Sequence, residues 1–218
     1  VLADIRGDVK YQSIHYQKRG PNMKKKKKKI AILIENKFEE PEIWYYKYRF
    51  SEEGADVHFL TRLWGQPELE FKGDLFQDIL KCNESFECMD EENLGSYAAV
   101  IVPGGMVSDK LRWTEDVNKL PPATSFLKRI FAEKSILKGI ICHGMLLVTF
   151  VPELVQGRRV VVNNNLIGDV RNMGAIYVDE NVVVDGDLVT ARSSGHCNVF
   201  ARKIIDLLDQ KYSKVQQL

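Results

Sequence analysis

Short apolar runs alternate with longer polar segments along most of the chain. Runs rich in branched apolar residues predict four buried strands. These runs are 29–36, 55–61, 98–102 and 136–142. Residues 40–54 predict a helix because acidic residues and Pro41 stand at its start and Gly54 at its end, and residues 122–134 predict another. Strands that alternate with helices predict an α/β fold, with a mostly parallel sheet covered by helices on both faces.

The last third of the chain predicts a helix, a further strand and a hairpin. Residues 143–150 predict a helix that follows the strand ending at Cys142, and the run RRVVV at 158–162 predicts another strand. In VVVDGDLVTAR (182–192), the Asp-Gly pair between β-branched runs is a hairpin signal. Residues 197–208 have apolar positions at helical spacing and predict a C-terminal helix. The polar stretch 62–96 shows no clear pattern of apolar positions, so the sequence does not decide between a small sheet extension and a lid there.

Length and charge favour one globular domain. A chain of 218 residues with 44% hydrophobic content buries one sizeable core, which we place at 29–210, followed by a tail at 211–218. Residues 1–28 predict a flexible basic extension, because they hold most of a run of six lysines. The formal net charge of the whole chain is +1. The six lysines carry +6 and the residues before them a net +2, so the rest of the chain has a net charge of −7. An acidic body argues against a nucleic-acid surface on the folded domain.

Four cysteines without a C-x-x-C pair make a disulfide framework improbable and favour a reducing compartment. No run of about 18 apolar residues occurs, so we expect no membrane span and a cytoplasmic protein. The pairs Cys142-His143 and His196-Cys197 contain good zinc ligands, but adjacent side chains diverge. We therefore expect no metal and no cofactor.

Three polar stretches fall where predicted strands end. They are FEEPE (38–42), PGGMVSD (103–109) and CHG (142–144). Open parallel sheets place their sites at the carboxyl ends of strands, so these stretches should meet. A cysteine in a tight turn between a strand and a helix N-terminus gains nucleophilic character, which makes Cys142 the candidate nucleophile. On this basis we predict that Cys142 is the most reactive thiol and that its pKa lies below that of a free cysteine.

The same stretches, in this order and spacing, resemble the PfpI/ThiJ family. The resemblance runs from about Lys29 to Leu208 and includes AAVIVPGG, ICHG, LVQGRRV and NMGAIYVDENVVVDGDLVTAR. It implies a flavodoxin-like α/β sandwich with Cys142 in a nucleophile elbow, His143 as its partner and Glu42 as a carboxyl that hydrogen-bonds the sulfur. The paired glycines of the turn allow backbone N–H groups to approach a reacting oxygen. The glycines assigned to this role are Gly104, Gly105 and Gly144.

The resemblance also implies an oligomer, either a dimer or a hexamer. In the PfpI-type branch, an acidic residue after the paired glycines crosses a subunit boundary and orients the histidine. Asp109 holds that position here, where a glutamate is usual. Its side chain is shorter by about one methylene, which makes this contact the least secure part of a Cys142-His143-Asp109 triad.

The function implied is that of a cofactor-independent enzyme of the glyoxalase III or deglycase kind. The Cys142 thiolate would attack a small 2-oxoaldehyde, and either Glu42 or His143 would move the proton that yields the 2-hydroxy acid. Peptidase or amidase activity and isocyanide hydration are alternatives within the enzyme class, so the expected small-molecule partner is an aldehyde or an amide. A different class is a redox-sensing or chaperone-like stress protein, in which Cys142 is oxidised and turnover is incidental.

Overall fold

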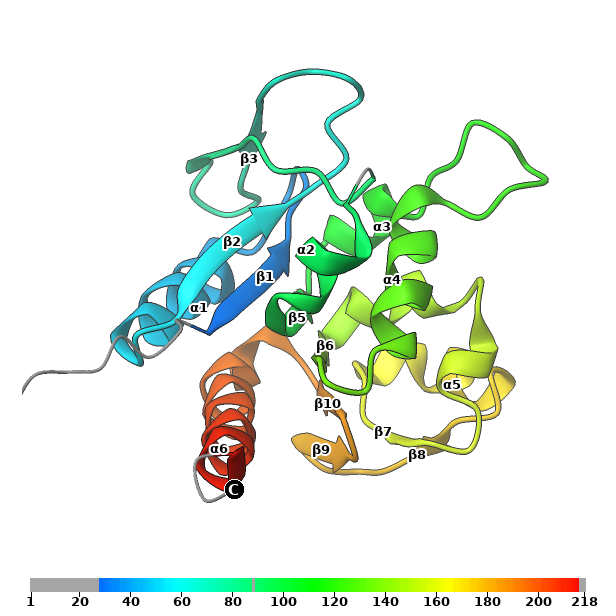
Figure 1. The fold of residues 1–218 in the computed structure, drawn as a ribbon. Helices are drawn as coiled ribbons and strands as arrows, with labels where there is room; N and C mark the ends of the chain where they lie inside the picture. Colours follow the sequence, from blue (N-terminus) through cyan, green and yellow to red (C-terminus); the bar gives the residue numbers. More distant parts are fainter. Residues whose placement is uncertain (1–27, 88, 216–218) are drawn as a thin grey trace, which may run out of the picture.

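A six-stranded sheet runs through the centre of the molecule, with strand order β2-β1-β5-β6-β10-β9 (Figure 1). The computed structural model describes residues 28–87 and 89–215, so most of the expected extension at 1–28, Cys88 and residues 216–218 lie outside the described residues. The strands of this sheet are β1 (Lys29–Leu33), β2 (Asp56–Leu60), β5 (Tyr97–Val102), β6 (Leu137–Ile141), β9 (Val182–Asp185) and β10 (Leu188–Ala191).

The order and direction of the strands confirm the flavodoxin-like α/β fold. Strands β2, β1, β5, β6 and β10 are parallel to their neighbours, and β9 pairs antiparallel with β10. Leaving out β9, the chain follows the doubly wound order 2-1-3-4-5, in which the winding reverses between β1 and β5. The carboxyl ends of these two strands diverge into a crevice, so residues that follow β1 and β5 face each other across it.

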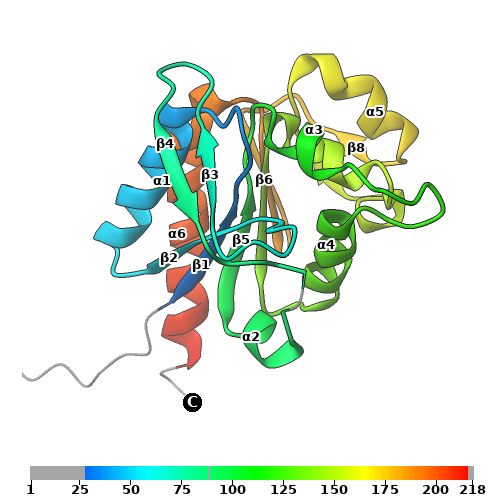
Figure 2. The same cartoon turned by 90° about the horizontal axis from the view of Figure 1, so that it is seen from above.

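Helices cover both faces of the sheet. Helices α1 (Glu40–Glu52) and α6 (Cys197–Val215) pack together on one face, and α4 (Pro122–Ala132) and α5 (Ile167–Asn172) lie on the other (Figure 2). The predicted helices at 40–54 and 122–134 are confirmed, each ending two residues early. Helix α4 is held to the sheet by an apolar stripe at helical spacing. The buried members of this stripe are Ala123, Phe126, Leu127, Ile130 and Phe131.

The stretch 62–96 forms a small hairpin outside the main sheet. Strands β3 (Leu69–Lys72) and β4 (Ile79–Cys82) pair antiparallel, and helix α2 (Glu91–Gly95) leads into β5. The hairpin loop is fastened to the start of α1, because the buried carboxylate of Glu40 accepts hydrogen bonds from the N–H groups of Leu75 (3.0 Å) and Phe76 (2.7 Å). The predicted sheet extension is thus a small sheet separate from the main one, and a lid role stays a prediction.

The segment after β6 differs from the predicted helix at 143–150. Residues Cys142–Val148 form a 3-10 helix of seven residues instead of an α-helix. Pro152 biases Val151 toward extended backbone, so this segment cannot continue into a longer helix. Short helix α3 (Val107–Leu111) packs against this segment, and the Ser108 hydroxyl donates to Gly144 O at 3.3 Å.

The carboxyl-terminal third contains the predicted hairpin and a second small sheet. Strands β9 and β10 join through Gly186 and Asp187, and Gly186 has φ +57, a conformation that favours glycine. Strands β7 (Arg159–Val160) and β8 (Ile176–Tyr177) pair in parallel outside the main sheet. Helix α6 continues to Val215, beyond the predicted end at residue 208 and into the tail expected at 211–218. No helix among the described residues combines the length and apolar character needed to cross a membrane.

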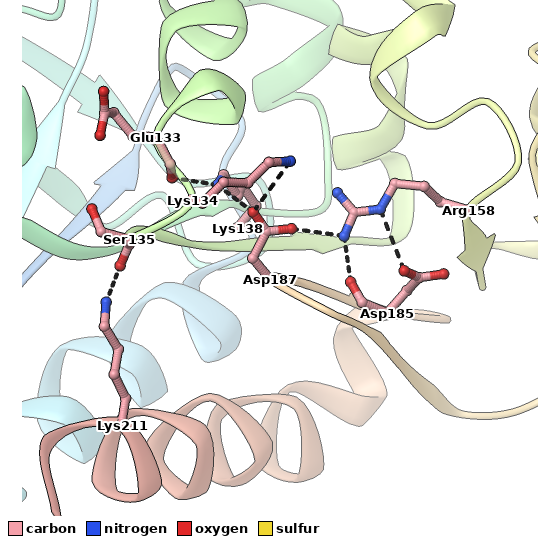
Figure 3. A network of polar contacts seen from close by, with 8 residues as sticks. All are labelled: Glu133, Lys134, Ser135, Lys138, Arg158, Asp185, Asp187 and Lys211. Carbon is pink, nitrogen blue, oxygen red and sulfur yellow. Dashed lines mark hydrogen bonds and ion pairs between the residues drawn. The ribbon is translucent and has the colours of Figure 1, made fainter. Parts of the chain in front are cut away.

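A partly buried ionic network lies at the amino end of the central strand β6 (Figure 3). Lys138, on the otherwise apolar strand β6, donates to Asp187 Oδ2 at 2.7 Å and to Glu133 O at 2.6 Å. Arg158 donates to Asp187 Oδ1 at 2.8 Å. Asp187 therefore ties the β9–β10 turn to β6 and to the segment before β7, at the opposite end of β6 from Cys142.

Candidate active site

Cys142 sits in a strained turn at the carboxyl end of β6. Its φ is +55, in the left-handed region, where a non-glycine residue costs on the order of 1–3 kcal/mol. The position two residues after Cys142 needs a glycine, because a Cβ on Gly144 would lie 2.6 Å from Val102 O. The strand therefore turns sharply against the end of β5. This strand-turn-helix junction has the geometry of a nucleophile elbow.

The structure corrects the predicted ionisation of Cys142. Burial raises its pKa above the ordinary value; hydrogen bonds from the Asn163 side chain and the His143 backbone oppose this, and the acidic Glu42 and Glu39 add to it. Only 4% of the residue is exposed, and the helix that follows is a short 3-10 segment. Burial therefore favours the thiol form of Cys142 at rest, and this effect outweighs the hydrogen bonds that favour the thiolate.

Glu42 lies beside Cys142, on the first turn of α1. Its Oε1 accepts a hydrogen bond from the Gly104 N–H at 3.1 Å, whereas its buried Oε2 has no hydrogen-bond partner among the described residues. Burial raises the pKa of Glu42 to about 8, with the Gly104 N–H and the Tyr46 hydroxyl opposing the shift and Glu39 adding to it. The Tyr46 hydroxyl is itself buried and makes no hydrogen bond of normal geometry to the carboxyl. A carboxyl group with this pKa exchanges a proton near neutral pH, as a general acid or base must.

The paired glycines allow this close approach. A Cβ on Gly104 would lie 2.9 Å from Glu42 Oε2 and 3.1 Å from Cys142 Cβ. Gly105 has φ +64, and a Cβ there would lie 3.2 Å from Lys37 O. The ends of β1, β5 and β6 thus meet, as the sequence predicted, although the Gly104 N–H is already donated to Glu42.

Two asparagines that sequence reasoning missed complete the surroundings of the dyad. His143 Nδ1 lies 3.2 Å from Cys142 Sγ, and His143 Nε2 lies 3.1 Å from Asn165 Nδ2. Asn163 Nδ2 lies 3.5 Å from the sulfur. The signal available in the sequence was the run Asn163-Asn164-Asn165 directly after the apolar run at 158–162. Consecutive asparagines are typical of turns, so the run carried no functional meaning without the fold.

Asp109 lies on α3 and pairs within its own chain. Its Oδ1 accepts a hydrogen bond from Arg112 Nη2 at 2.9 Å, and among the described residues no hydrogen bond joins it to His143. A contact across a subunit boundary stays a prediction for this residue.

The second histidine-cysteine pair lies at the start of α6. His196 Nδ1 is 2.9 Å from Ser193 Oγ, and burial raises the pKa of Cys197 to about 11. Within residues 28–87 and 89–215, no group of three or more His, Cys, Asp or Glu side chains is arranged to hold a metal ion.

Curated relatives cover nearly the whole folded part of the chain. Protein/nucleic acid deglycase 2 of Escherichia coli (strain K12) is 31% identical over 182 residues, which span 83% of this chain and 98% of that protein. Deglycase PfpI of Pyrococcus furiosus is 28% identical over 184 residues, which span 83% of this chain and 99% of that protein. The enzyme names belong to those proteins.

A solved structure supports the same relationship. A two-domain protein from Anabaena variabilis, containing dj-1/thij/pfpi-like and ferritin-like domains, matches with a TM-score of 0.73 and 28% identity over 84% of this chain and 48% of that chain. In addition, residues 28–207 match the DJ-1/PfpI family. Because this match covers most of its length, the chain belongs to the DJ-1/PfpI family.

Proposed function

We propose that the chain is a cofactor-independent cysteine enzyme that acts on small carbonyl compounds. In this proposal it converts 2-oxoaldehydes, or their adducts with amines, to 2-hydroxy acids. The observation that carries the proposal is a strained Cys142 beside the buried Glu42, whose pKa of about 8 suits proton transfer near neutral pH. The deglycase names of two relatives that align along almost their full length support it.

The proposed reaction needs no external oxidant or reductant. The sulfur attacks the aldehyde carbon, the carbonyl oxygen takes up a proton, and a hemithioacetal forms. A base removes the hydrogen from that carbon, and a proton returns to the neighbouring ketone carbon, which leaves a thioester of the 2-hydroxy acid. Water cleaves the thioester and restores the thiol. Methylglyoxal plus one water thus becomes lactate, because one carbon is oxidised while its neighbour is reduced.

Two groups of the site suit the proton transfers. Glu42 Oε2 is buried and unpartnered among the described residues, and His143 Nδ1 lies 3.2 Å from the sulfur. We place the developing oxyanion against the backbone N–H groups of Gly105 and Gly144. The Gly104 N–H holds Glu42 in place.

Burial of the thiol favours small substrates and argues against two of the alternatives, a peptide substrate and a redox sensor. Because only 4% of Cys142 is exposed, a small aldehyde reaches the sulfur more readily than a peptide does. A sulfur in a residue that is only 4% exposed is also poorly placed to meet peroxide, so burial weighs against the redox-sensor alternative. The raised pKa of Cys142 lowers the thiolate fraction for every reaction of this thiol, so the proposed reaction needs a base for the thiol proton.

The test is to follow lactate formation from methylglyoxal by proton NMR without glutathione or added metal. We expect turnover in the wild type, none in Cys142→Ala, and an unchanged rate in the matched control Cys197→Ala, because Cys197 has its pKa raised to about 11. Lactate formation at the wild-type rate in Cys142→Ala would overturn the proposal. For adducts of methylglyoxal with an amine, the rate of amine release is measured with and without enzyme at the same concentration of free methylglyoxal. A true deglycase releases the amine faster under this condition, whereas an enzyme that only removes the free aldehyde does not.

A further inference from the structure

The imidazole ring of His143 is contacted at both nitrogens by side chains of its own chain. Nδ1 faces Cys142 Sγ at 3.2 Å, and Nε2 faces the amide nitrogen of Asn165 at 3.1 Å. The ring orientation is therefore defined without a second subunit. The partner at Nε2 is a neutral amide, where the resemblance to the PfpI-type branch implied a carboxylate.

A hydrogen-bonded turn holds Asn165 in place. The Asn165 N–H donates to Asn163 Oδ1 at 3.4 Å, and Asn163 in turn directs its amide nitrogen toward Cys142 Sγ at 3.5 Å. Arg192, at the carboxyl end of β10, donates to Asn164 Oδ1 at 2.7 Å and to Tyr177 OH at 3.0 Å. The turn is thus anchored by Arg192 to the end of β10, and both amide side chains reach the dyad from this one turn.

The chemistry of the amide sets which ring nitrogen carries the proton. An amide nitrogen only donates, so a neutral imidazole whose Nε2 faces it must accept there and carry its proton on Nδ1. A carboxylate at the same place would only accept, which would put a proton on Nε2 and favour the charged ring. The two partners therefore impose opposite roles on His143.

We propose that Asn165 is a positioning residue that holds neutral His143 in its Nδ1–H form, so that His143 donates a hydrogen bond to the Cys142 sulfur instead of taking the thiol proton. This inference rests on the proposed function only in that it assigns His143 a role in that reaction. The base for the thiol and for the carbon-bound hydrogen is then Glu42, through its unpartnered Oε2.

The surroundings of the sulfur agree with this arrangement. The acidic groups near it are Glu42 from α1 and Glu39 before α1, and both oppose its ionisation. The donors that favour the thiolate are neutral: the Asn163 amide, the His143 backbone N–H and, in the proposed form, His143 Nδ1–H. No carboxylate among the described residues is hydrogen-bonded to the ring to stabilise an imidazolium.

The test compares Asn165→Asp and Asn165→Ala with Asn118→Asp, which adds the same charge at an exposed loop position. NMR of protein labelled with 15N in its histidines identifies the protonated ring nitrogen. We expect the proton on Nδ1 in the wild type and on Nε2 in Asn165→Asp. The pH midpoint for alkylation of Cys142 should fall by about one unit or more in Asn165→Asp and stay at the wild-type value in Asn118→Asp. Asn165→Ala should lose about tenfold in turnover, the equivalent of one ordinary hydrogen bond.

Two results would overturn the inference. One is a wild-type His143 with its proton on Nε2, which would mean that the amide oxygen faces the ring. The other is an unchanged alkylation midpoint in Asn165→Asp. Neither readout needs turnover. A wild type that leaves methylglyoxal intact but shows the Nδ1 proton and the shifted midpoint would contradict the proposed function alone.

Discussion

The carboxyl group of Glu42 accepts a hydrogen bond from the Gly104 N–H at 3.1 Å and leaves its other oxygen buried without a partner among the described residues. The first contact fixes the carboxyl between the ends of β1 and β5, where the winding of the sheet reverses. The second feature leaves one oxygen available to exchange a proton with a substrate. In the proposed reaction, one oxygen of Glu42 therefore positions the side chain and the other exchanges the proton.

Replacing Glu42 by glutamine separates these two roles. The amide oxygen of Glu42→Gln still accepts from Gly104, so we expect an intact fold, but the amide cannot exchange a proton. Turnover of methylglyoxal should fall by about 100-fold, the low end for loss of a general acid–base group. Steady-state kinetics with circular dichroism as the folding control measure this. Unchanged turnover would reassign the base to His143 or to water.

Glu42 should also make stability depend on pH. Its pKa in the folded protein is about 8 against an ordinary 4.5, so the folded state favours the protonated form. This contribution is complete below pH 4.5 and is lost as the pH rises toward 8. The full shift corresponds to about 5 kcal/mol, an upper bound. Urea unfolding of wild type and Glu42→Gln at pH 5 and pH 8 should therefore show a steeper loss in the wild type, whereas parallel losses would contradict the assignment.

The cysteine thiols should differ in reactivity. The three that the structure describes, Cys82, Cys142 and Cys197, should all react faster as the pH rises. Burial raises the pKa of Cys82 and of Cys197 to about 11, and it raises that of Cys142 as well. Cys142 Sγ also faces the amide nitrogen of Asn163 and the ring nitrogen Nδ1 of His143. We therefore expect Cys142 to be alkylated first, with the pH midpoint of its alkylation above the ordinary pKa of a thiol. Peptide mapping after alkylation across a pH series measures each thiol, including Cys88. Equal labelling of Cys82, Cys142 and Cys197 at neutral pH would contradict this order.

The sequence predicted the sheet, its parallel direction and the meeting of FEEPE, PGG and CHG, because buried strands and their terminal turns leave strong local patterns. It did not predict the direction of the Cys142 pKa shift, since burial of one sulfur depends on contacts from α1 and β5 that are distant in sequence. Nor did it assign Asn165, whose role depends on a turn anchored by Arg192 from another strand. Local patterns thus single out Cys142 as the candidate nucleophile, whereas the groups around its sulfur come from the tertiary fold.

The Lys138–Asp187 pair should support stability and leave catalysis unchanged, because it lies at the amino end of β6 (Figure 3). In Lys138→Met, Asp187 keeps Arg158 as a partner, so we expect a loss of roughly 1–3 kcal/mol, below the usual cost of breaking a buried pair. The matched control is Lys134→Met, which removes an exposed lysine 4.0 Å from the same carboxylate. Urea unfolding should show little change in this control. Equal loss in both variants would contradict a special role for the buried lysine.

The last prediction concerns Asp109 and the assembly. The resemblance implies that Asp109 reaches the histidine of a neighbouring subunit in a dimer or hexamer, whereas in the described chain it pairs with Arg112 at 2.9 Å and His143 Nε2 faces Asn165 at 3.1 Å. Asn165 and a partner's carboxylate would compete for that ring nitrogen. If Asn165 holds it, Asp109→Ala should keep nearly full turnover, and activity should fall in Asn165→Ala instead.

Mixing subunits decides between the two arrangements. Light scattering first establishes whether the wild type is an oligomer, and Cys142→Ala is then co-assembled with Asp109→Ala. If Asp109→Ala alone is inactive and the mixture recovers activity, each site takes its carboxylate from a neighbour, because only a mixed interface then joins an intact cysteine to an intact aspartate. Such recovery would contradict orientation of His143 by Asn165. We expect the opposite result, in which Asp109→Ala is active alone and dilution with Cys142→Ala lowers activity in proportion to the fraction of intact cysteines.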